Sequence, residues 1–189
     1  MSLDDERVRF YLRHAEQIEA WAALRVDVAE AVHAWLARLA EPLEGIASEA
    51  GPDVRTFART DDDTTYPKLF LRREHWPMKD GSPTVAIGLE WQRTKTTFRG
   101  GSLPYVGVRA SKGEPVGAAL RASEAFSQLR RARRDKSSDW WAAWAEVPCP
   151  DGFPDARDAA RDALVSAIRS AWQAYAPLVD AALRGAPRG

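Results

Sequence analysis

The segment 84–92 alternates large apolar residues with small or polar ones, and this alternation constrains the fold more than any other feature of the chain. Val85, Ile87, Leu89 and Trp91 share one face of an extended chain, which is the period-two pattern of a half-buried β-strand. Three further segments are candidate strands: 54–59, 68–73 and 105–110. Short turn-forming clusters separate them, whereas parallel strands need crossovers of a dozen or more residues. We therefore expect an antiparallel meander.

Helical patterns lie on both sides of this meander. Ser2 and Asp27 both resemble N-caps, and each precedes apolar residues spaced three and four apart, so two helices are expected there. A third helix is predicted over 115–134, and a last one after Asp155. The segment 138–147 stays open, because its alternation favours a strand while its alanines favour a helical turn.

The chain shows no linker and no internal repeat, so its 189 residues are expected to form a single domain, 1–189. Its parts are an N-terminal helical hairpin (3–50), a β-meander (53–110) and a C-terminal helical part (115–185). The simplest architecture is a two-layer α+β fold. In it, an antiparallel sheet of about four strands carries the hairpin and two further helices.

Composition narrows the classes of function. Lys plus Arg and Asp plus Glu number 27 each, so no overall field attracts nucleic acid or a membrane, although a local patch stays open. The single Cys149 excludes an internal disulfide and suits a reducing cytoplasm. No apolar run approaches the roughly 20 residues that span a bilayer. Usage rich in alanine and arginine is typical of bacteria with GC-rich genomes.

Acidic residues near the predicted strands are the candidates for catalysis. Glu90 and Gln92 lie on the strand face opposite the apolar one, and the acidic run with Asp62 and Asp63 precedes an earlier strand. Mg²⁺ prefers such oxygen ligands, and it can activate a water for attack on a phosphodiester. The alternative is a solvated turn and a polar strand face. Lys95 lies nearby in the sequence.

This arrangement resembles the PD-(D/E)xK nuclease superfamily, in which an acid opens one strand and an acid-x-lysine pair follows on the next. The resemblance covers about residues 60–110, and Gln92 stands where the family places lysine. It implies a divergent Mg²⁺-dependent nuclease with Asp62 or Asp63, Glu90 and Gln92 in the active site. Asp62 and Glu90 would then be the metal ligands.

A second resemblance concerns the order of segments along the chain: a turn at 74–77, strands at 87–91 and 105–108, and the segment 137–141. This order is similar to the C-terminal region of uncharacterised prokaryotic proteins, including ones with nuclease domains in phage-defence settings. This resemblance implies a fold and no catalytic residues.

Two clusters are candidates for binding. Arginines crowd the end of the third predicted helix, where they complement the helix dipole or contact phosphate: Arg130, Arg131, Arg133 and Arg134. Three tryptophans follow within five residues and cannot all face one core: Trp140, Trp141 and Trp144. Either at least one ring meets a partner, or the flanking helices cover both sides.

The sequence thus predicts a cytoplasmic bacterial binding protein that works without catalysis and without a cofactor. Its expected partner is a protein, a second copy of the chain or a nucleic acid, and not a membrane. The alternative is the nuclease with Mg²⁺, so the sequence leaves open whether the protein is an enzyme.

Overall fold

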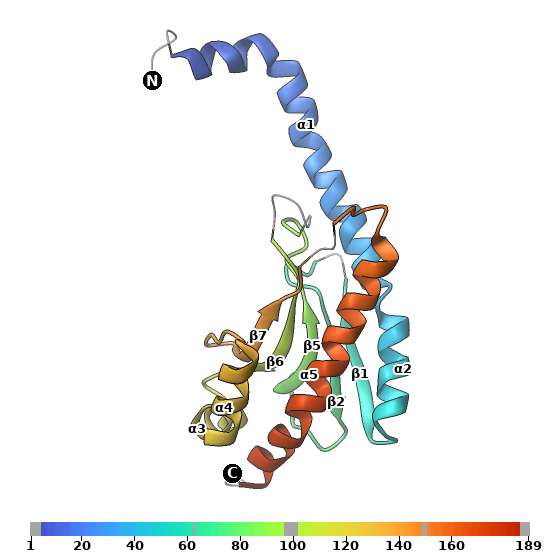
Figure 1. Ribbon diagram of the computed structural model, residues 1–189, viewed down its shortest axis with the longest axis vertical. Coiled ribbons are helices and arrows are strands. Elements are labelled where there is room, and N and C mark those ends of the chain that lie inside the picture. Colours follow the sequence, from blue (N-terminus) through green and yellow to red (C-terminus); the bar gives the residue numbers. More distant parts are fainter. Residues whose placement is uncertain (1–4, 62, 97–101, 149–150, 186–189) are drawn as a thin grey trace.

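The computed structural model describes residues 5–61, 63–96, 102–148 and 151–185, and its centre is a five-stranded antiparallel sheet (Figure 1). The hydrogen-bonded order is β1 (Val54–Arg59), β2 (Lys68–Arg73), β5 (Val85–Glu90), β6 (Tyr105–Ala110) and β7 (Trp141–Glu146). A small hairpin between β2 and β5 contains β3 (Met78–Lys79) and β4 (Ser82–Pro83). The predicted meander is confirmed, and the segment 138–147 supplies its fifth strand.

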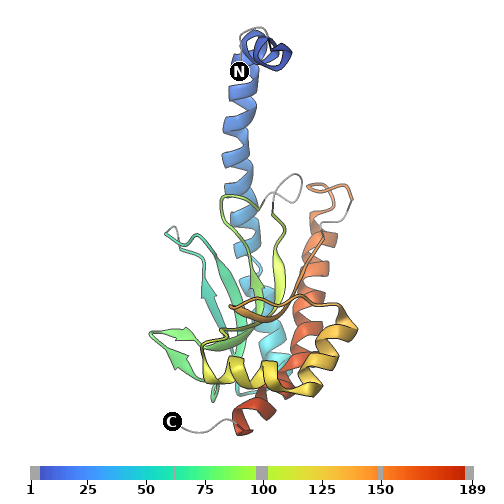
Figure 2. The same ribbon diagram turned by 90° about the vertical axis from the view of Figure 1, so that its left-hand side faces the viewer.

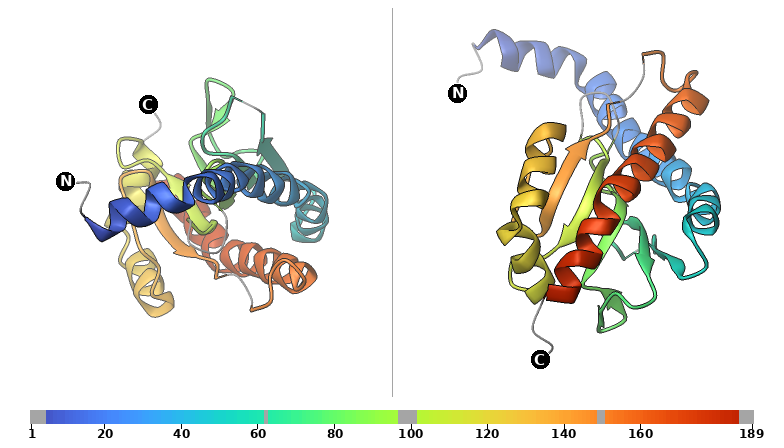
Figure 3. Two further views of the ribbon diagram at one scale, coloured as in Figure 1. Left: turned by 90° about the horizontal axis from the view of Figure 1, so that it is seen from above. Right: turned by 60° about the horizontal axis from the view of Figure 1, so that its bottom comes forward.

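Helices cover one face of this sheet. α2 (Ala40–Ala50) and α5 (Arg157–Gly185) lie across it (Figures 1 and 3). The alternating residues Val85, Ile87 and Leu89 of β5 are fully buried in the main hydrophobic core, to which both helices contribute. The apolar stripe of α5 is buried with them: Ala160, Leu164, Ile168, Trp172, Tyr175 and Val179. The expected two-layer α+β class is confirmed, because an amphipathic helix and a half-buried strand cover each other's apolar sides.

The third predicted helix is divided into α3 (Pro115–Ala122) and α4 (Glu124–Arg133). Ser123 between them has extended backbone angles, and its side chain accepts a hydrogen bond from the amide of Phe126 at 3.3 Å. A serine that caps a helix in this way favours a break over a continuous helix. Both helices pack against α5.

The N-terminal helices do not form the expected hairpin, and they divide at another place than predicted (Figure 1). α1 (Glu6–Ala37) runs through Asp27, and the break before α2 comes at Arg38 and Leu39. The two helices follow one another end to end, and the first part of α1 projects far beyond the sheet (Figures 1 and 2).

Among the described residues, the contacts between α1 and the body lie toward the C-terminal end of α1. The indole of Trp91 donates to Nδ1 of His33 at 3.2 Å, and Arg93 pairs with Glu30 at 2.9 Å. None of the described helices combines the length and the apolar character that a bilayer-spanning segment needs.

Candidate binding site on the open sheet face

The face of the sheet turned away from α2 and α5 carries polar and aromatic side chains, and we call it the open face. Residues paired across neighbouring strands share a face, so the strand register defines it. One row across all five strands is Arg59, Lys68, Glu90, Tyr105 and Glu146. The next row is Phe57, Phe70, Gly88, Gly107 and Trp144. A third row, further along the strands, contains two sets of paired residues: Arg55 with Arg72, and Ala86 with Arg109 and Trp141.

Cations outnumber carboxylates in these rows. The cations are Arg55, Arg59, Lys68, Arg72 and Arg109, and the carboxylates are Glu90 and Glu146. The chain as a whole is neutral. The alternation of strand residues has therefore collected cations and aromatic rings on one face. Glu74 beside Arg55 at 2.5 Å and Asp61 beside Arg59 at 3.8 Å neutralise part of that charge, which leaves the positive excess around Lys68 and Arg109.

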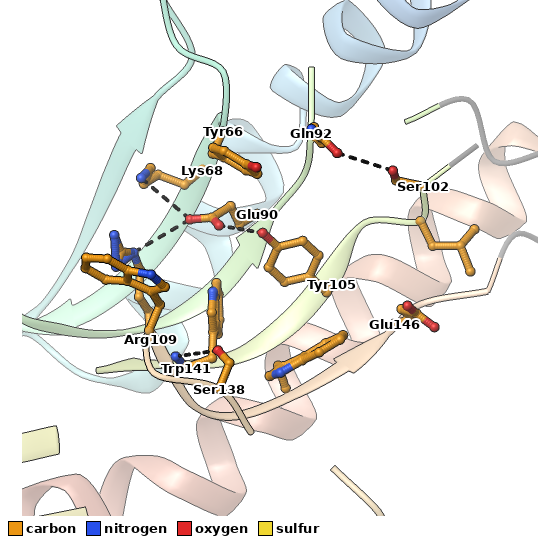
Figure 4. A pocket seen from close by; sticks show the side chains of 13 residues that line it. Tyr66, Lys68, Glu90, Gln92, Ser102, Tyr105, Arg109, Ser138, Trp141 and Glu146 are labelled. Atoms are coloured by element: carbon orange, nitrogen blue, oxygen red, sulfur yellow. Dashed lines mark hydrogen bonds and ion pairs between the residues drawn. The ribbon is translucent and has the colours of Figure 1, made fainter. Parts of the chain in front are cut away.

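A pocket of about 730 Å³ opens on this face, over β2, β5, β6 and β7. Its floor is Glu90, of which only 6% is exposed. Oε1 accepts a hydrogen bond from the hydroxyl of Tyr105 at 2.5 Å (Figure 4). Oε2 lies 3.5 Å from Nζ of Lys68 and 3.6 Å from Nε of Arg109. Two cations around one carboxylate leave this floor with a net positive charge.

Burial perturbs the titration of the groups around Glu90. Desolvation lowers the pKa of Lys68, and the negative charge of Glu90 opposes that shift only in part. Desolvation also raises the pKa of the Tyr105 phenol, and the neighbouring carboxylate raises it further. Tyr105 therefore remains a hydrogen-bond donor far into the alkaline range.

Aromatic rings form the wall of the pocket next to β7. Trp141 is buried with its ring edge-on to Tyr105 at 5.2 Å, and Trp144 lies 5.6 Å from the same phenol ring. The indole Nε1 of Trp144 is buried and has no hydrogen-bond partner among the described residues. Trp140 at the rim is 62% exposed, and the guanidinium of Arg109 lies 5.8 Å from its ring. The three tryptophans of the predicted cluster therefore differ in exposure: Trp141 is buried, Trp140 is exposed at the rim, and Trp144 is partly buried.

The acidic candidates are not gathered at one point. Glu90 and Gln92 both line the pocket, and the side-chain oxygen of Gln92 lies 3.5 Å from the hydroxyl of Ser102. Asp63 and Lys95 are exposed and do not line the pocket. Asp62 lies outside the described residues, as does Cys149. Within the described part of the chain, no group of three or more His, Cys, Asp or Glu side chains is arranged to hold a metal ion.

The arginine cluster belongs to the helical side of the molecule. Arg133 pairs with Asp135 at 3.3 Å and donates to the Ser170 hydroxyl on α5 at 3.2 Å. Arg131 pairs with Glu124 at 3.0 Å. Arg130 lies in the last turn of α4 and donates to the Ser137 hydroxyl, and Arg134 is the C-cap of that helix. None of the four lines the pocket.

Three residues of the pocket floor were missed in the sequence: Lys68, Tyr105 and Arg109. The signal that would have found them is the strand period itself, because each alternates with buried apolar residues on its own strand. Antiparallel pairing then places them on the same face as Glu90. The missing information was the register between strands, which the sequence did not specify.

Comparisons of the chain with protein-family models, with curated proteins and with solved structures found no match.

Proposed function

We propose that this protein binds single-stranded nucleic acid on the open face of its sheet, without catalysis. The observation that carries the proposal is the combination of cations and accessible rings around one pocket: Lys68, Arg109 and Arg59 beside Trp140, Trp144 and Tyr66. Proteins that bind single strands combine a positive groove for the phosphates with aromatic platforms for the bases. An open antiparallel sheet with rings on its surface is one such platform.

A single strand suits this site better than a duplex. Trp140 and Tyr66 are 62% and 46% exposed at the pocket rim, and a ring can stack on a base only when that base is unpaired. The buried Nε1 of Trp144 is a donor that still needs an acceptor.

The donor set around Glu90 favours binding over metal-dependent cleavage. Both carboxylate oxygens already face positive or donating groups, namely Lys68, Arg109 and Tyr105. Positive charges at this distance repel a divalent cation. A nuclease that uses Glu90 as its Mg²⁺ ligand would have to displace them. We place the protein in the cytoplasm, because a chain with one cysteine suits a reducing compartment.

The test is fluorescence anisotropy with labelled 12-nucleotide single-stranded DNA, single-stranded RNA and the matching duplex. We would run it at two salt concentrations with Mg²⁺ present, and we expect tighter binding of the single strands and weaker binding at higher salt. Absence of binding at low salt, or equal affinity for the duplex, would overturn the proposal. The same samples on a denaturing gel test the nuclease alternative. It requires that the wild type cuts the strands and that the Glu90→Gln variant does not.

Matched variants locate the site. Trp140→Ala should weaken single-strand binding by roughly 5- to 100-fold, the usual effect of a lost base-stacking ring. Phe10→Ala removes a ring of similar exposure, 59%, from the first turns of α1 and should leave affinity unchanged. Arg59→Ala should reduce the slope of affinity against salt by about 0.7, whereas Arg134→Ala should not. The opposite result for the two arginines would move the site to the end of α4.

A further inference from the structure

The projecting part of α1 exposes an apolar surface. Residues 15–28 extend away from the sheet as a single helix (Figures 1 and 2). On this stretch Trp21 is 68% exposed, Leu24 55% and Val28 46%. A lone helix of this length is marginal in water, and several large apolar side chains in solvent mark a contact surface.

These side chains follow the spacing of a two-helix seam. The seam residues are separated alternately by three and four positions: His14, Gln17, Trp21, Leu24, Val28, Ala31 and Trp35. This is the heptad pattern by which two helices pack side by side. The C-terminal half of the seam borders a groove of about 810 Å³, whose other wall includes Phe153 and Pro154. The groove thus offers room for a second helix along α1.

Charged residues beside the seam indicate which helix would pack against α1. Arg13 and Asp27 are both exposed and lie two heptads apart, so they flank the seam on the same side. Neither side chain has a hydrogen bond or an ion pair with any other residue that the structure describes. The turn before the seam is neutral, because Arg7 pairs with Asp5 at 2.9 Å and Glu6 stands beside Arg9. The free charges beside the seam are therefore those of Arg13 and Asp27.

We propose that residues 13–27 of α1 pair with the same stretch of a second copy of the chain, in antiparallel orientation. Packing Trp21 against Gln17 of the second copy, and Leu24 against His14, places Arg13 opposite Asp27 of the second copy. The two-fold symmetry of the pair makes this contact twice. A parallel pair would instead place Arg13 beside Ile18 and Asp27 beside Val32 of the second copy, so neither charge would meet an opposite one. The helix bends at His14, so the pairing stretch reaches its N-terminal limit there.

The oligomeric state tests the proposal, measured by sedimentation equilibrium over a wide range of protein concentration. The wild type should dimerise. Leu24→Glu should raise the dimer dissociation constant at least about tenfold, because it buries a charge in the seam. Val26→Glu is the matched control, since Val26 is 62% exposed and lies on the opposite side of the same helix. A wild type that stays monomeric, or a dimer that Leu24→Glu leaves unchanged, would overturn the proposal.

A charge swap tests the antiparallel register. Arg13→Asp and Asp27→Arg should each weaken the dimer several-fold, and the double variant should recover most of the affinity. The two side chains are 14 residues apart on one helix, about 21 Å, so recovery cannot arise within one copy. Additive weakening in the double variant would exclude this register. Circular dichroism and thermal unfolding of each variant show whether the body is still folded.

Discussion

The carboxylate of Glu90 is buried, and its partners are two cations and a phenol on neighbouring strands. A buried charge is costly unless it is paired and hydrogen-bonded, and here Lys68, Arg109 and Tyr105 supply those interactions. The same interactions hold the two cations at the pocket floor. Glu90 therefore contributes to the stability of the fold and to the positive charge of the site.

Replacing Glu90 by Gln should lower the free energy of unfolding by about 2–3 kcal/mol, as measured by urea unfolding. The change leaves Lys68 and Arg109 without their counter-charge, and their side chains are only 16% and 27% exposed. Glu146→Gln is the control, because Glu146 is in the same row but its side chain is 48% exposed. Its effect should stay below about 1 kcal/mol. Equal losses would mean that Glu90 is not held by these cations.

Tyr105 makes stability depend on alkaline pH. Its pKa in the folded protein lies above the ordinary value of 10.0, so the unfolded phenol ionises first as the pH rises. The stabilisation that the phenol supplies is complete below about pH 10 and is lost progressively above it. The difference in unfolding free energy between the wild type and Tyr105→Phe should therefore become smaller as the pH rises from 9 to 11. These two values lie about one unit below and above the pKa of an ordinary phenol. A constant difference would show that the phenol titrates normally.

Among the elements, α5 adds a polar contact to its apolar packing on the sheet through the side chain of Asp180. Asp180 accepts a hydrogen bond from the indole of Trp76 at 2.7 Å and pairs with Nε of Arg73 at 3.0 Å. His75 lies 3.2 Å away on the same turn after β2. The aspartate side chain is 16% exposed. This contact joins residues about a hundred positions apart in the sequence.

Asp180→Ala should lower the free energy of unfolding by about 2–4 kcal/mol. It leaves the buried indole N–H of Trp76 without an acceptor and Nε of Arg73 without its carboxylate, while Nη1 of Arg73 keeps Asp53 at 3.0 Å. Thermal or urea unfolding measures the loss. The control is Glu49→Ala, which breaks the pair between α2 and Arg169 of α5 at 3.0 Å. Glu49 is 64% exposed, so less than about 1 kcal/mol is expected. A similar loss in both variants would contradict the special role of Asp180.

The whole molecule consists of a two-layer body and a projecting helix, and these two parts carry the two proposals. The open face lies on the body, and the seam lies on α1 (Figure 2). Residues 15–28 contribute no side chain to the buried core. The body should therefore keep its fold without them.

A chain shortened to begin at residue 29 should unfold cooperatively, with a free energy within about 1 kcal/mol of the full chain at low protein concentration. At high concentration the full chain should gain stability by mass action if it dimerises, and the shortened chain should not. Single-strand binding by the shortened chain should equal that of one copy of the full chain. Loss of cooperative unfolding would show that the projecting helix supports the body.

Local pattern alone predicts four of the five strands of the main sheet, whereas it leaves β7 open between strand and helix and does not predict the short hairpin of β3 and β4. The bounds of β1, β2 and β6 equal those expected, because turn-forming residues on both sides fix where each strand begins and ends. The buried stripe of α5 follows from its spacing in the same way. The helix break at Ser123 and the continuation of α1 through Asp27 were missed, because a capping residue signals a start only where packing allows it.

The sequence by itself thus determined the α+β class, four strands of the main sheet and the face of the 84–92 strand that enters the core, since these depend on neighbouring residues and on period. Only the tertiary structure decided which polar residues meet. Lys68, Glu90, Tyr105 and Arg109 come from three strands, and their contact depends on inter-strand register. The same packing left α1 outside the body, because α2 and α5 already cover the apolar face of the sheet. Register and coverage are properties of the assembled chain, and no local window of sequence contains them.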